Sequence, residues 1–276
     1  MGEMAYFSLK DGGQLYYEDT GRGDQTILML HGWISTHKVF SKSLSAIGNA
    51  SRCITYDHIG HGKSMKAAKE PITMDMLASD LNELITGLDL HDLTLLGWSM
   101  GAGAILNYVS RYGCGALRQI VLCDMSPRQM NDEDWTLGLF QGQLTKEFAE
   151  NEAGKDFYDF YKSFAVGALP KLARLPEFLL RAILRKKLAQ CDEKATVSLA
   201  RSMQEADYRR VVGQIDVPVH YFYAIPGSLF SPELADWYRD HIKAPFQSMG
   251  FPNSTHMLMG EHPRQFADAV LRVLSD

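Results

Sequence analysis

Residues 93–101, Leu93-Thr94-Leu95-Leu96-Gly97-Trp98-Ser99-Met100-Gly101, decide the fold of this chain. An apolar run leads into Gly-x-Ser-x-Gly, and residues 102–109 that follow have a helical pattern. This order predicts a buried strand, one sharp turn and a helix, the context in which the central serine stands above the edge of a sheet as a nucleophile. Glycines flank Ser99 at a distance of two residues because nearby backbone leaves no room for a Cβ atom. A turn without chemistry is the alternative, and the flanking strand and helix disfavour it.

Composition excludes several classes of partner. The chain has 276 residues, a length at which α/β proteins often form one domain, and its apolar content of 46% is ordinary for a globular protein. A formal net charge of −5 disfavours nucleic-acid binding, which requires clustered Lys and Arg. The longest uncharged stretch, residues 93–110, is too short and too polar for a membrane span of about 20 residues. We therefore expect a small-molecule substrate, and the oligomeric state stays open.

Two features predict a cytoplasmic location. Residues 1–13 contain no apolar segment of the kind found in secretory signals. The four cysteines show no Cys-x-x-Cys spacing, and Cys53 and Cys123 lie within apolar, strand-like runs. Such cysteines are typical of buried thiols in a reducing compartment.

Short apolar runs alternate with helical patterns along most of the chain, which predicts a mostly parallel sheet of eight strands with helices on both faces. The alternation stops after Pro127, and the aromatic-rich segment that follows is helical in pattern until about Tyr208. We therefore expect an α/β core formed by residues 1–126 and 209–276, with residues 127–208 inserted as a helical cap. Strands are expected at residues 5–9, 14–18, 26–30, 53–56, 93–96, 120–123, 217–223 and 246–249, and core helices at 39–47, 74–88, 102–112, 232–241 and 263–274.

A serine nucleophile needs a general base, which we expect on a loop after the last strand. His256 follows Asn253-Ser254-Thr255 and shortly precedes Glu261-His262-Pro263, where the closing helix is expected to begin. That position places the His256 imidazole over the C-terminal edge of the sheet, so His256 is the candidate base. A surface-loop histidine is the less favoured alternative. His262 lies at an expected helix N-terminus and is expected to be solvated.

The negative charge that develops on an attacked carbonyl needs backbone donors opposite the nucleophile. One is expected from the N–H of Met100, directly after the serine, and another from the loop Leu30-His31-Gly32-Trp33, where Gly32 permits a tight bend that turns the Trp33 N–H inward. Met100 and Trp33 are therefore the candidate oxyanion-hole residues.

Asp124 is the candidate for the acid that orients the histidine. It ends the strand expected at residues 120–123, which should lie about 4.8 Å from the Ser99 strand with its C-terminal end at the same edge. A carboxylate there can reach the Nδ1 side of His256. The alternative for Asp124 is a turn or capping residue before Pro127.

Other carboxylates lie in less suitable places. Residues 224–231, which follow the next strand, contain none. Glu233 and Asp236 fall inside an expected helix, and Asp216 precedes its strand at the wrong end. We therefore prefer Asp124.

Two further motifs have ordinary explanations. The segment Asp57-His58-Ile59-Gly60-His61-Gly62-Lys63-Ser64 lacks the spacing of a phosphate-binding loop, and its histidines have no helical Glu nearby for zinc. We expect it to pack behind the site. Arg185-Lys186-Lys187 is expected to be a solvated helix face.

Taken together, these motifs resemble the α/β-hydrolase superfamily, most closely its serine-nucleophile esterases and cofactor-free haloperoxidases. The resemblance rests on His31-Gly32-Trp33, Asp57 to Ser64 (similar to the family's Asp-x-x-Gly-x-Gly-x-Ser), Gly97 to Gly101, and His256. It covers nearly the whole chain outside the cap. The departure is the missing acid after the seventh strand, and Asp124 looks like the arrangement of members whose acid follows the sixth.

The resemblance implies hydrolysis of a carboxylic ester or related acyl bond through an acyl-enzyme on Ser99, with His256 as base and Asp124 as its partner. It implies no metal and no organic cofactor. An aromatic cap favours a small to medium, largely apolar substrate. The candidate substrate-binding residues are Trp33, Trp98 and Trp135.

Two other functions stay open on the same fold. One is a cofactor-free oxygenase, in which the same side chains deprotonate a hydroxylated aromatic ring and no acyl-enzyme forms, or a haloperoxidase-type enzyme with the same triad. The other is a ligand receptor that retains the triad and signals through its cap.

Overall fold

The computed structural model describes residues 3–64, 71–152 and 155–275. Its centre is one sheet of eight strands in the order β1-β2-β4-β3-β5-β6-β7-β8. Pairing is antiparallel between β1 and β2 and between β2 and β4, and parallel from β4 to β8. The predicted mostly parallel eight-stranded sheet is thus confirmed. The strands are β1 (Glu3–Ser8), β2 (Gln14–Asp19), β3 (Thr26–Leu30), β4 (Arg52–Tyr56), β5 (Leu93–Trp98), β6 (Leu117–Cys123), β7 (Val219–Gly227) and β8 (Phe246–Thr255).

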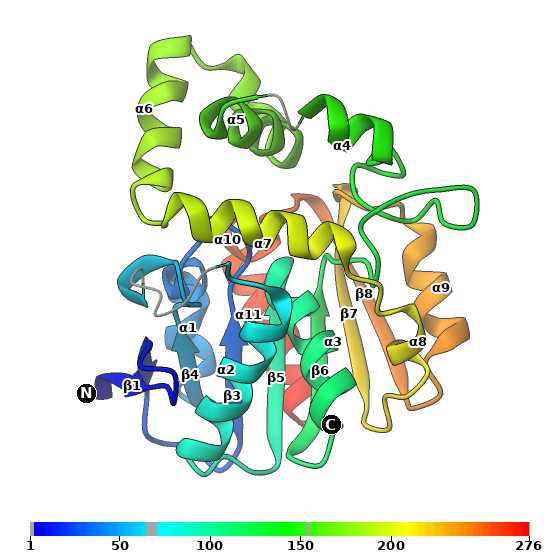
Figure 1. The fold of residues 1–276 in the computed structure, drawn as a ribbon. Coiled ribbons are helices and arrows are strands. Elements are labelled where there is room, and N and C mark those ends of the chain that lie inside the picture. The colour runs from blue at the N-terminus through cyan, green and yellow to red at the C-terminus, as the bar shows by residue number, and fades with distance from the viewer. Residues whose placement is uncertain (1–2, 65–70, 153–154, 276) are drawn as a thin grey trace.

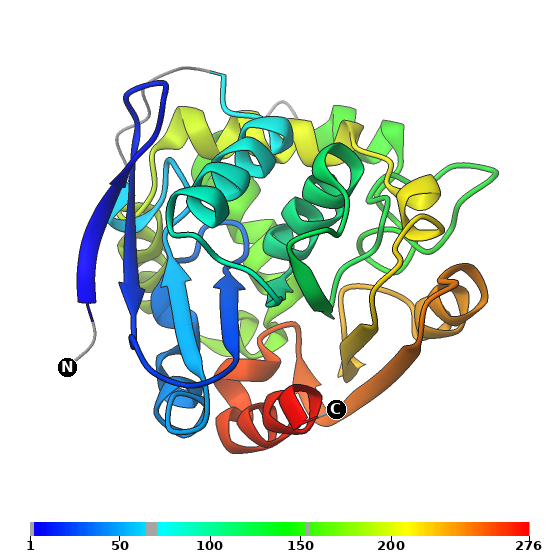
Figure 2. The same ribbon diagram turned by 90° about the horizontal axis from the view of Figure 1, so that it is seen from below.

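Helices cover both faces of the sheet because its central strands are apolar on both sides. On β3, Leu28 and Leu30 belong to the larger buried cluster, whereas Ile27 and Met29 belong to a second cluster on the opposite face. Figure 2 shows α2 and α3 on one face and α1 and α11 on the other. These helices are α1 (Ser41–Ile47), α2 (Met74–Gly87), α3 (Met100–Tyr112) and α11 (Pro263–Ser275), with α9 (Glu233–His241) and α10 (Leu258–Glu261) beside β8.

Between β6 and β7 the described residues form five α-helices and one short 3-10 helix (Pro170–Arg174), and Figure 1 shows α4 to α7 as a layer across one end of the sheet. Tyr208 N–H donates to the Pro127 carbonyl over 2.8 Å, which joins the two ends of this insertion. These ends coincide with the cap boundaries that we propose, 127 and 208. The five helices are α4 (Lys146–Glu152), α5 (Phe157–Ala168), α6 (Glu177–Leu188), α7 (Glu193–Glu205) and α8 (Arg209–Val212).

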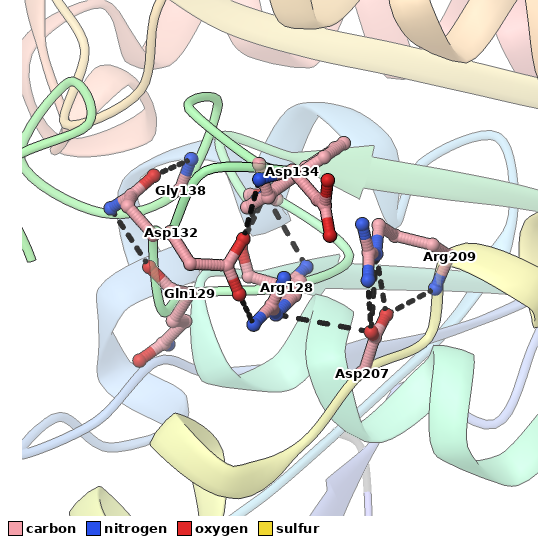
Figure 3. Close-up of polar contacts among 10 residues, drawn as sticks. Arg128, Gln129, Asp132, Asp134, Gly138, Asp207 and Arg209 are labelled. Carbon is pink, nitrogen blue, oxygen red and sulfur yellow. Dashed lines mark hydrogen bonds and ion pairs between the residues drawn. The ribbon is translucent and has the colours of Figure 1, made fainter. Parts of the chain in front are cut away.

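Charged side chains strengthen this junction. Figure 3 shows that Arg128 contacts both Asp132 and Asp207, and that Asp207 also accepts from Arg209 over 2.7 Å. Arg128 and Asp207 also form a backbone bridge. The start and the end of the insertion are therefore held side by side at the core.

The last strand differs from its prediction. β8 continues to Thr255, whereas the sequence predicts a strand at residues 246–249 only. Gly250, Pro252 and Asn253 interrupt the apolar alternation and hide the second half of the strand. A strand at the edge of a sheet tolerates such residues because it pairs on one side alone. The extension carries the chain directly to His256. None of the helices in the described part of the chain is long and apolar enough to span a membrane.

Candidate active site

Ser99 stands alone between β5 and α3, in the sharp turn that the sequence predicts. Its φ of 54° and ψ of −122° lie outside the regions that side chains normally adopt. Its N–H donates to the Cys123 carbonyl over 2.9 Å, and its carbonyl accepts from the N–H of Ala102 over 2.8 Å. These two bonds stabilise the strained turn, and such strain is typical of functional positions.

The glycines around Ser99 are required by close backbone contacts. A Cβ atom on Gly97 would lie 2.5 Å from the backbone N of Ala102, and one on Gly101 would overlap the Leu30 carbonyl. Gly32, in the loop after β3, faces the same turn, because a Cβ there would lie 3.0 Å from Ser99 Cβ. Three glycines thus let β3, β5 and α3 meet at the serine.

His256 and Asp124 form a buried pair. His256 follows β8, Asp124 follows β6, and His256 Nδ1 lies 2.7 Å from Asp124 Oδ2. Both side chains are almost inaccessible, at 2% and 0% exposure. His256 Nε2 is buried and has no hydrogen-bond partner among the described residues. The indole N–H of Trp98 donates to the His256 carbonyl over 2.8 Å and so fixes the backbone that carries the imidazole.

Asp124 is held by more than the histidine. Its φ of 48° turns the chain sharply after β6, and its N–H donates to the Phe222 carbonyl over 2.7 Å. Its second oxygen, Oδ1, accepts from the Ser228 hydroxyl over 2.7 Å and from the Ala224 N–H over 3.2 Å. Hydrogen bonds of this kind fix the plane of the carboxylate.

Ser99 and His256 open onto one cavity of about 120 Å³. Its floor comes from the sheet edge and includes Trp33 and Trp98, and its roof comes from α5, the segment after it, and α6. The indole N–H of Trp33 donates to the Thr196 carbonyl of α7 over 2.9 Å, which joins the cavity floor to the inserted helices. Apart from Ser99 and His256, the lining is largely apolar: Trp33, Ile34, Trp98, Tyr161, Phe164, Ala165, Ala168, Leu169, Leu172, Ile183, Leu184 and Met257, with Ser35 and Lys187.

The two candidate oxyanion donors lie beside Ser99 in sequence or space. Met100 is the first residue of α3 and is fully buried. Its N–H has no acceptor within its own helix because it lies in the first turn. Trp33 follows Gly32 on the cavity floor. The roles of both residues remain proposals.

Trp135 does not belong to this cavity. It lines a separate cavity of about 590 Å³ with Trp237 and Arg209, and its indole N–H donates to the Arg128 carbonyl over 2.9 Å. The cation of Arg209 lies over the Trp135 ring, 5.2 Å from its centre. The structure therefore places Trp135 apart from Trp33 and Trp98, at the junction of insertion and core, and its role in substrate binding stays a prediction.

The glycine-rich segment after β4 packs behind the loop that carries Trp33. His31 Nε2 accepts from the His58 N–H over 3.0 Å, and His61 Nε2 accepts from the Ile34 N–H over 3.3 Å. All three histidines are buried. Desolvation lowers the pKa of His58 to about 3 and of His61 to about 4. Within residues 3–64, 71–152 and 155–275, no group of three ligand side chains is placed to hold a metal ion.

Because His58 is buried in its neutral form, we expect the free energy of unfolding to decrease in acid. Its pKa is about 6.5 in an unfolded chain and about 3 when folded, so the unfolded state binds the extra proton between these values. Stability is therefore fully present above about pH 6.5 and falls as the pH drops toward 3. His58→Phe keeps the backbone bond to His31, and neither ring nitrogen has a partner to lose among the described residues.

We expect His58→Phe to resist acid better than the wild type by about 3 kcal/mol at about pH 4.5, measured by urea unfolding across the pH range. His91→Phe is the matched control, since His91 is exposed. Parallel stability curves for wild type and His58→Phe would contradict the prediction.

Two residues that sequence reasoning missed support the site. Ser228 donates to Asp124, and it lies within the loop after β7 that contains no carboxylate. Glu261 accepts from both the N–H and the hydroxyl of Thr255, over 2.7 and 2.9 Å, and so holds the turn that presents His256. Burial raises the pKa of Glu261, but these hydrogen bonds and the nearby Lys171 cation together lower it overall. His262, the other histidine near the end of the chain, is half-buried, and its Nε2 lies 3.2 Å from the Asn253 carbonyl, away from Asp124 and His256.

Comparison with known proteins agrees with this architecture. A family model described as the alpha/beta hydrolase fold matches residues 25–262, and this chain belongs to that family. The pimeloyl-[acyl-carrier protein] methyl ester esterase of Sodalis glossinidius is 26% identical over 93% of this chain and 96% of its own. The non-heme chloroperoxidase CPO-A1 of Kitasatospora aureofaciens is 37% identical over 48% of this chain and 47% of its own. The chain thus spans about half the length of that chloroperoxidase and of two further haloperoxidase relatives.

Solved structures show the same fold. A bromoperoxidase from Bacillus anthracis superposes with a TM-score of 0.83 at 25% identity, with both chains covered completely. An esterase from Exiguobacterium antarcticum also gives 0.83, at 23% identity and full coverage of both chains. The chain is therefore similar to enzymes with esterase or haloperoxidase names.

Proposed function

We propose that this protein is a serine hydrolase that cleaves a carboxylic ester or related acyl bond through an acyl-enzyme on Ser99. One observation carries the proposal. A serine in a strained strand-to-helix turn opens onto the same cavity as a buried histidine, whose far nitrogen is hydrogen-bonded to a carboxylate. Serine, imidazole and carboxylate are the three groups that acyl transfer by this route requires.

In the proposed reaction, His256 Nε2 takes the proton of the Ser99 hydroxyl as Oγ attacks the carbonyl carbon. The same proton then passes to the leaving alkoxide as the ester C–O bond breaks, which leaves Ser99 acylated. Water attacks the acyl carbon next and His256 takes its proton. The bond from the acyl carbon to Ser99 Oγ then breaks, His256 returns the proton to Oγ, and the acid is released. Asp124 holds the imidazole in the correct tautomer and stabilises its charged form without itself becoming protonated.

The N–H groups of Met100 and Trp33 are the proposed donors to the oxyanion that forms in each tetrahedral intermediate. Both are backbone groups, so they need no reorganisation as charge develops. The side chain of Trp33 shapes the cavity and that of Met100 packs in the core. Removal of one such donor typically lowers turnover by about 10²–10³-fold.

The lining favours an apolar acyl or aryl group. Aliphatic and aromatic side chains from α5 and α6 form most of the roof, and few polar side chains line the cavity besides Ser99 and His256. Similarity to an ester-cleaving relative over 93% of this chain supports the reaction class. A small-molecule ester is therefore the proposed substrate, and a cytoplasmic location stays a prediction.

Covalent labelling tests the proposal directly. A fluorophosphonate should add to one residue per chain, and peptide mass spectrometry should place the adduct on Ser99. The p-nitrophenyl esters of short fatty acids should be hydrolysed at a rate that falls in proportion to the labelled fraction. Unmodified Ser99 after prolonged exposure, in protein that is folded, would overturn the proposal.

Haloperoxidase-type activity is the second candidate, favoured by relatives that carry that name. The two functions make different predictions for the same assay series. A hydrolase turns over esters without halide or peroxide, whereas the alternative halogenates an electron-rich ring only when both are supplied. Halogenation of such a ring that depends on both halide and peroxide, by protein that hydrolyses no ester in their absence, would favour the alternative.

A further inference from the structure

Two apolar cavities lie against helix α5. The first is the Ser99 cavity, and the second has a volume of about 200 Å³ and lies between α5, α4 and the segment that precedes α4. Among the residues that the structure describes, Phe164 is the one that lines both. The second cavity is lined by Leu139, Phe140, Gln143, Leu144, Phe148, Ala149, Glu152, Phe160, Ser163, Phe164, Gly167 and Gln204.

The periodicity of α5 explains this arrangement. Tyr161, Ala165 and Ala168 project to the Ser99 cavity, whereas Phe160 and Gly167 border the second one. At about 100° per residue these are two adjacent faces of one helix, and position 164 falls on the line between them. Phe164 therefore occupies the boundary by its place in the helix.

Ring contacts fix the Phe164 side chain on that boundary. On one side, its ring meets Trp33 edge-on, with centres 5.2 Å apart and planes at 90°. On the other side it meets Phe140, with centres 6.1 Å apart. Trp33 lines the first cavity and Phe140 the second, so one phenyl ring separates the two spaces.

The volumes of the two cavities, about 120 and 200 Å³, are each small for a substrate site. Sites for small molecules usually occupy about 300–1,000 Å³. Neither cavity reaches that range alone, whereas the two joined would. Half-buried phenylalanines around the second cavity, Phe140, Phe148 and Phe160, offer the kind of surface that an extended apolar chain covers.

We propose that Phe164 determines the length of the acyl chain that the enzyme accepts, by closing the Ser99 cavity against a second apolar chamber that takes the distal end of longer chains when the ring is removed. This inference rests on the proposed ester hydrolysis at Ser99. Phe164 is then a specificity-determining residue, and its effect should grow with every carbon of the acyl chain that would extend past its ring.

Gly167 offers an independent way to test the second chamber. It lies three residues after Phe164 on α5 and borders the second cavity but not the first. A Cβ atom there would lie 3.3 Å from a ring carbon of Phe140, so a larger side chain would fill the chamber. Gly167→Leu should block the chamber, and leucine is also better than glycine within a helix.

The experiment measures kcat/KM for p-nitrophenyl esters of saturated acids from two to twelve carbons. Wild type, Phe164→Ala, Gly167→Leu and the double variant are compared, each shown to be folded by its thermal transition. Phe164→Leu accompanies them as a milder substitution, in case the alanine variant fails to fold. Each additional buried methylene should raise kcat/KM roughly four- to tenfold.

We expect Phe164→Ala to shift the preferred chain by at least two carbons and to raise the ratio of decanoate to butyrate hydrolysis at least about tenfold. Gly167→Leu should cancel that gain in the double variant and leave the butyrate rate of the wild type unchanged. An unchanged chain-length profile in Phe164→Ala and Phe164→Leu would overturn the proposal. A gain that Gly167→Leu does not reverse would also overturn it, since general loosening of the helices would then explain the change.

Binding separates failure of this inference from failure of the proposed function. Saturated fatty acids of eight and twelve carbons are titrated by calorimetry into Ser99→Ala, with and without Phe164→Ala. If the Phe164 ring closes the cavity, its removal should strengthen binding of the longer acid at least about tenfold more than binding of the shorter one. If no ester is hydrolysed but this difference in binding appears, the proposed ester hydrolysis is wrong and the proposed role of Phe164 is supported. Equal effects on the binding of both acids would overturn the proposed role of Phe164, whatever reaction the enzyme catalyses.

Discussion

Ser99→Ala is expected to lower kcat for a short p-nitrophenyl ester by about 10⁶-fold. Alanine retains the Cβ atom of serine, so the hydrogen bonds of the strained turn through the backbone N–H and carbonyl stay intact. The loss is then confined to the nucleophile. Residual catalysis of about 10³–10⁴-fold over water should remain, because the backbone donors and the cavity are still present.

Stopped-flow burst kinetics and steady-state rates check this prediction, and ligand binding should be unaffected. Ser43→Ala is the matched control. Ser43 is also buried, and its hydroxyl donates to the Pro263 carbonyl over 3.0 Å, away from the cavity. Its loss should lower stability by about 1 kcal/mol and leave kcat unchanged. If Ser99→Ala retained more than about one hundredth of the wild-type rate, Ser99 would not be the nucleophile.

The sheet and its helices could be predicted from the sequence because their signals are local. The strand at residues 26–30 has the predicted limits, and the helix after Ser99 begins at Met100, two residues before its predicted start. Uninterrupted apolar runs mark strands that are buried on both faces. β8 was predicted only in part, since an edge strand needs no such run.

The approach of His256 to Asp124 could be anticipated from strand order alone. β6 and β7 lie between β5 and β8, and all four end at one edge, so the residues that follow them converge. The contribution of Ser228 could not be foreseen in this way. Ser228 lies in the loop after β7, where the family resemblance leads one to expect the catalytic acid. Its hydroxyl instead donates a hydrogen bond to Asp124, and only the turn after β7 brings the two side chains together.

Tertiary packing also decides which aromatic residues face the cavity. Trp33 and Trp98 follow or end central strands, and strand ends fix their positions at the sheet edge. Trp135 lies in an irregular segment after β6, where no periodicity indicates a direction. The sequence therefore could not show that Trp135 lies apart from Trp33 and Trp98. The boundary position of Phe164 was hidden because it depends on how α5 packs between two cavities.

Asp124→Asn is expected to lower kcat by about 10⁴-fold and to leave the fold intact. The carboxylate accepts from His256 Nδ1, from the Ser228 hydroxyl and from the Ala224 N–H. An amide in its place can donate to Nδ1, which favours the imidazole tautomer with its proton on Nε2. That nitrogen can then no longer accept the proton of Ser99. The measurement is kcat for p-nitrophenyl butyrate, together with the rate of fluorophosphonate labelling, which should fall in parallel.

A second buried histidine–carboxylate pair supplies the control for this variant. His37 Nδ1 lies 2.7 Å from Asp57 Oδ1, and both side chains are as inaccessible as those of the Asp124 pair. Asp57 also accepts from the His37 and Lys63 N–H groups, so Asp57→Asn should lower the melting temperature. It should leave kcat of the folded protein within about threefold of wild type, because that pair faces no nucleophile.

The comparison of the two variants distinguishes orientation of a base from support of the fold. Exposed Asp236→Asn and Asp216→Asn should change neither activity nor stability appreciably. If Asp124→Asn lost less than about tenfold in kcat, the orienting acid would lie elsewhere, and the bond to His256 would be structural like that of Asp57 to His37. If both Asn variants lost activity in proportion to their melting temperatures, instability would explain both. A loss confined to Asp124→Asn, at an unchanged melting temperature, assigns the chemistry to the carboxylate after β6.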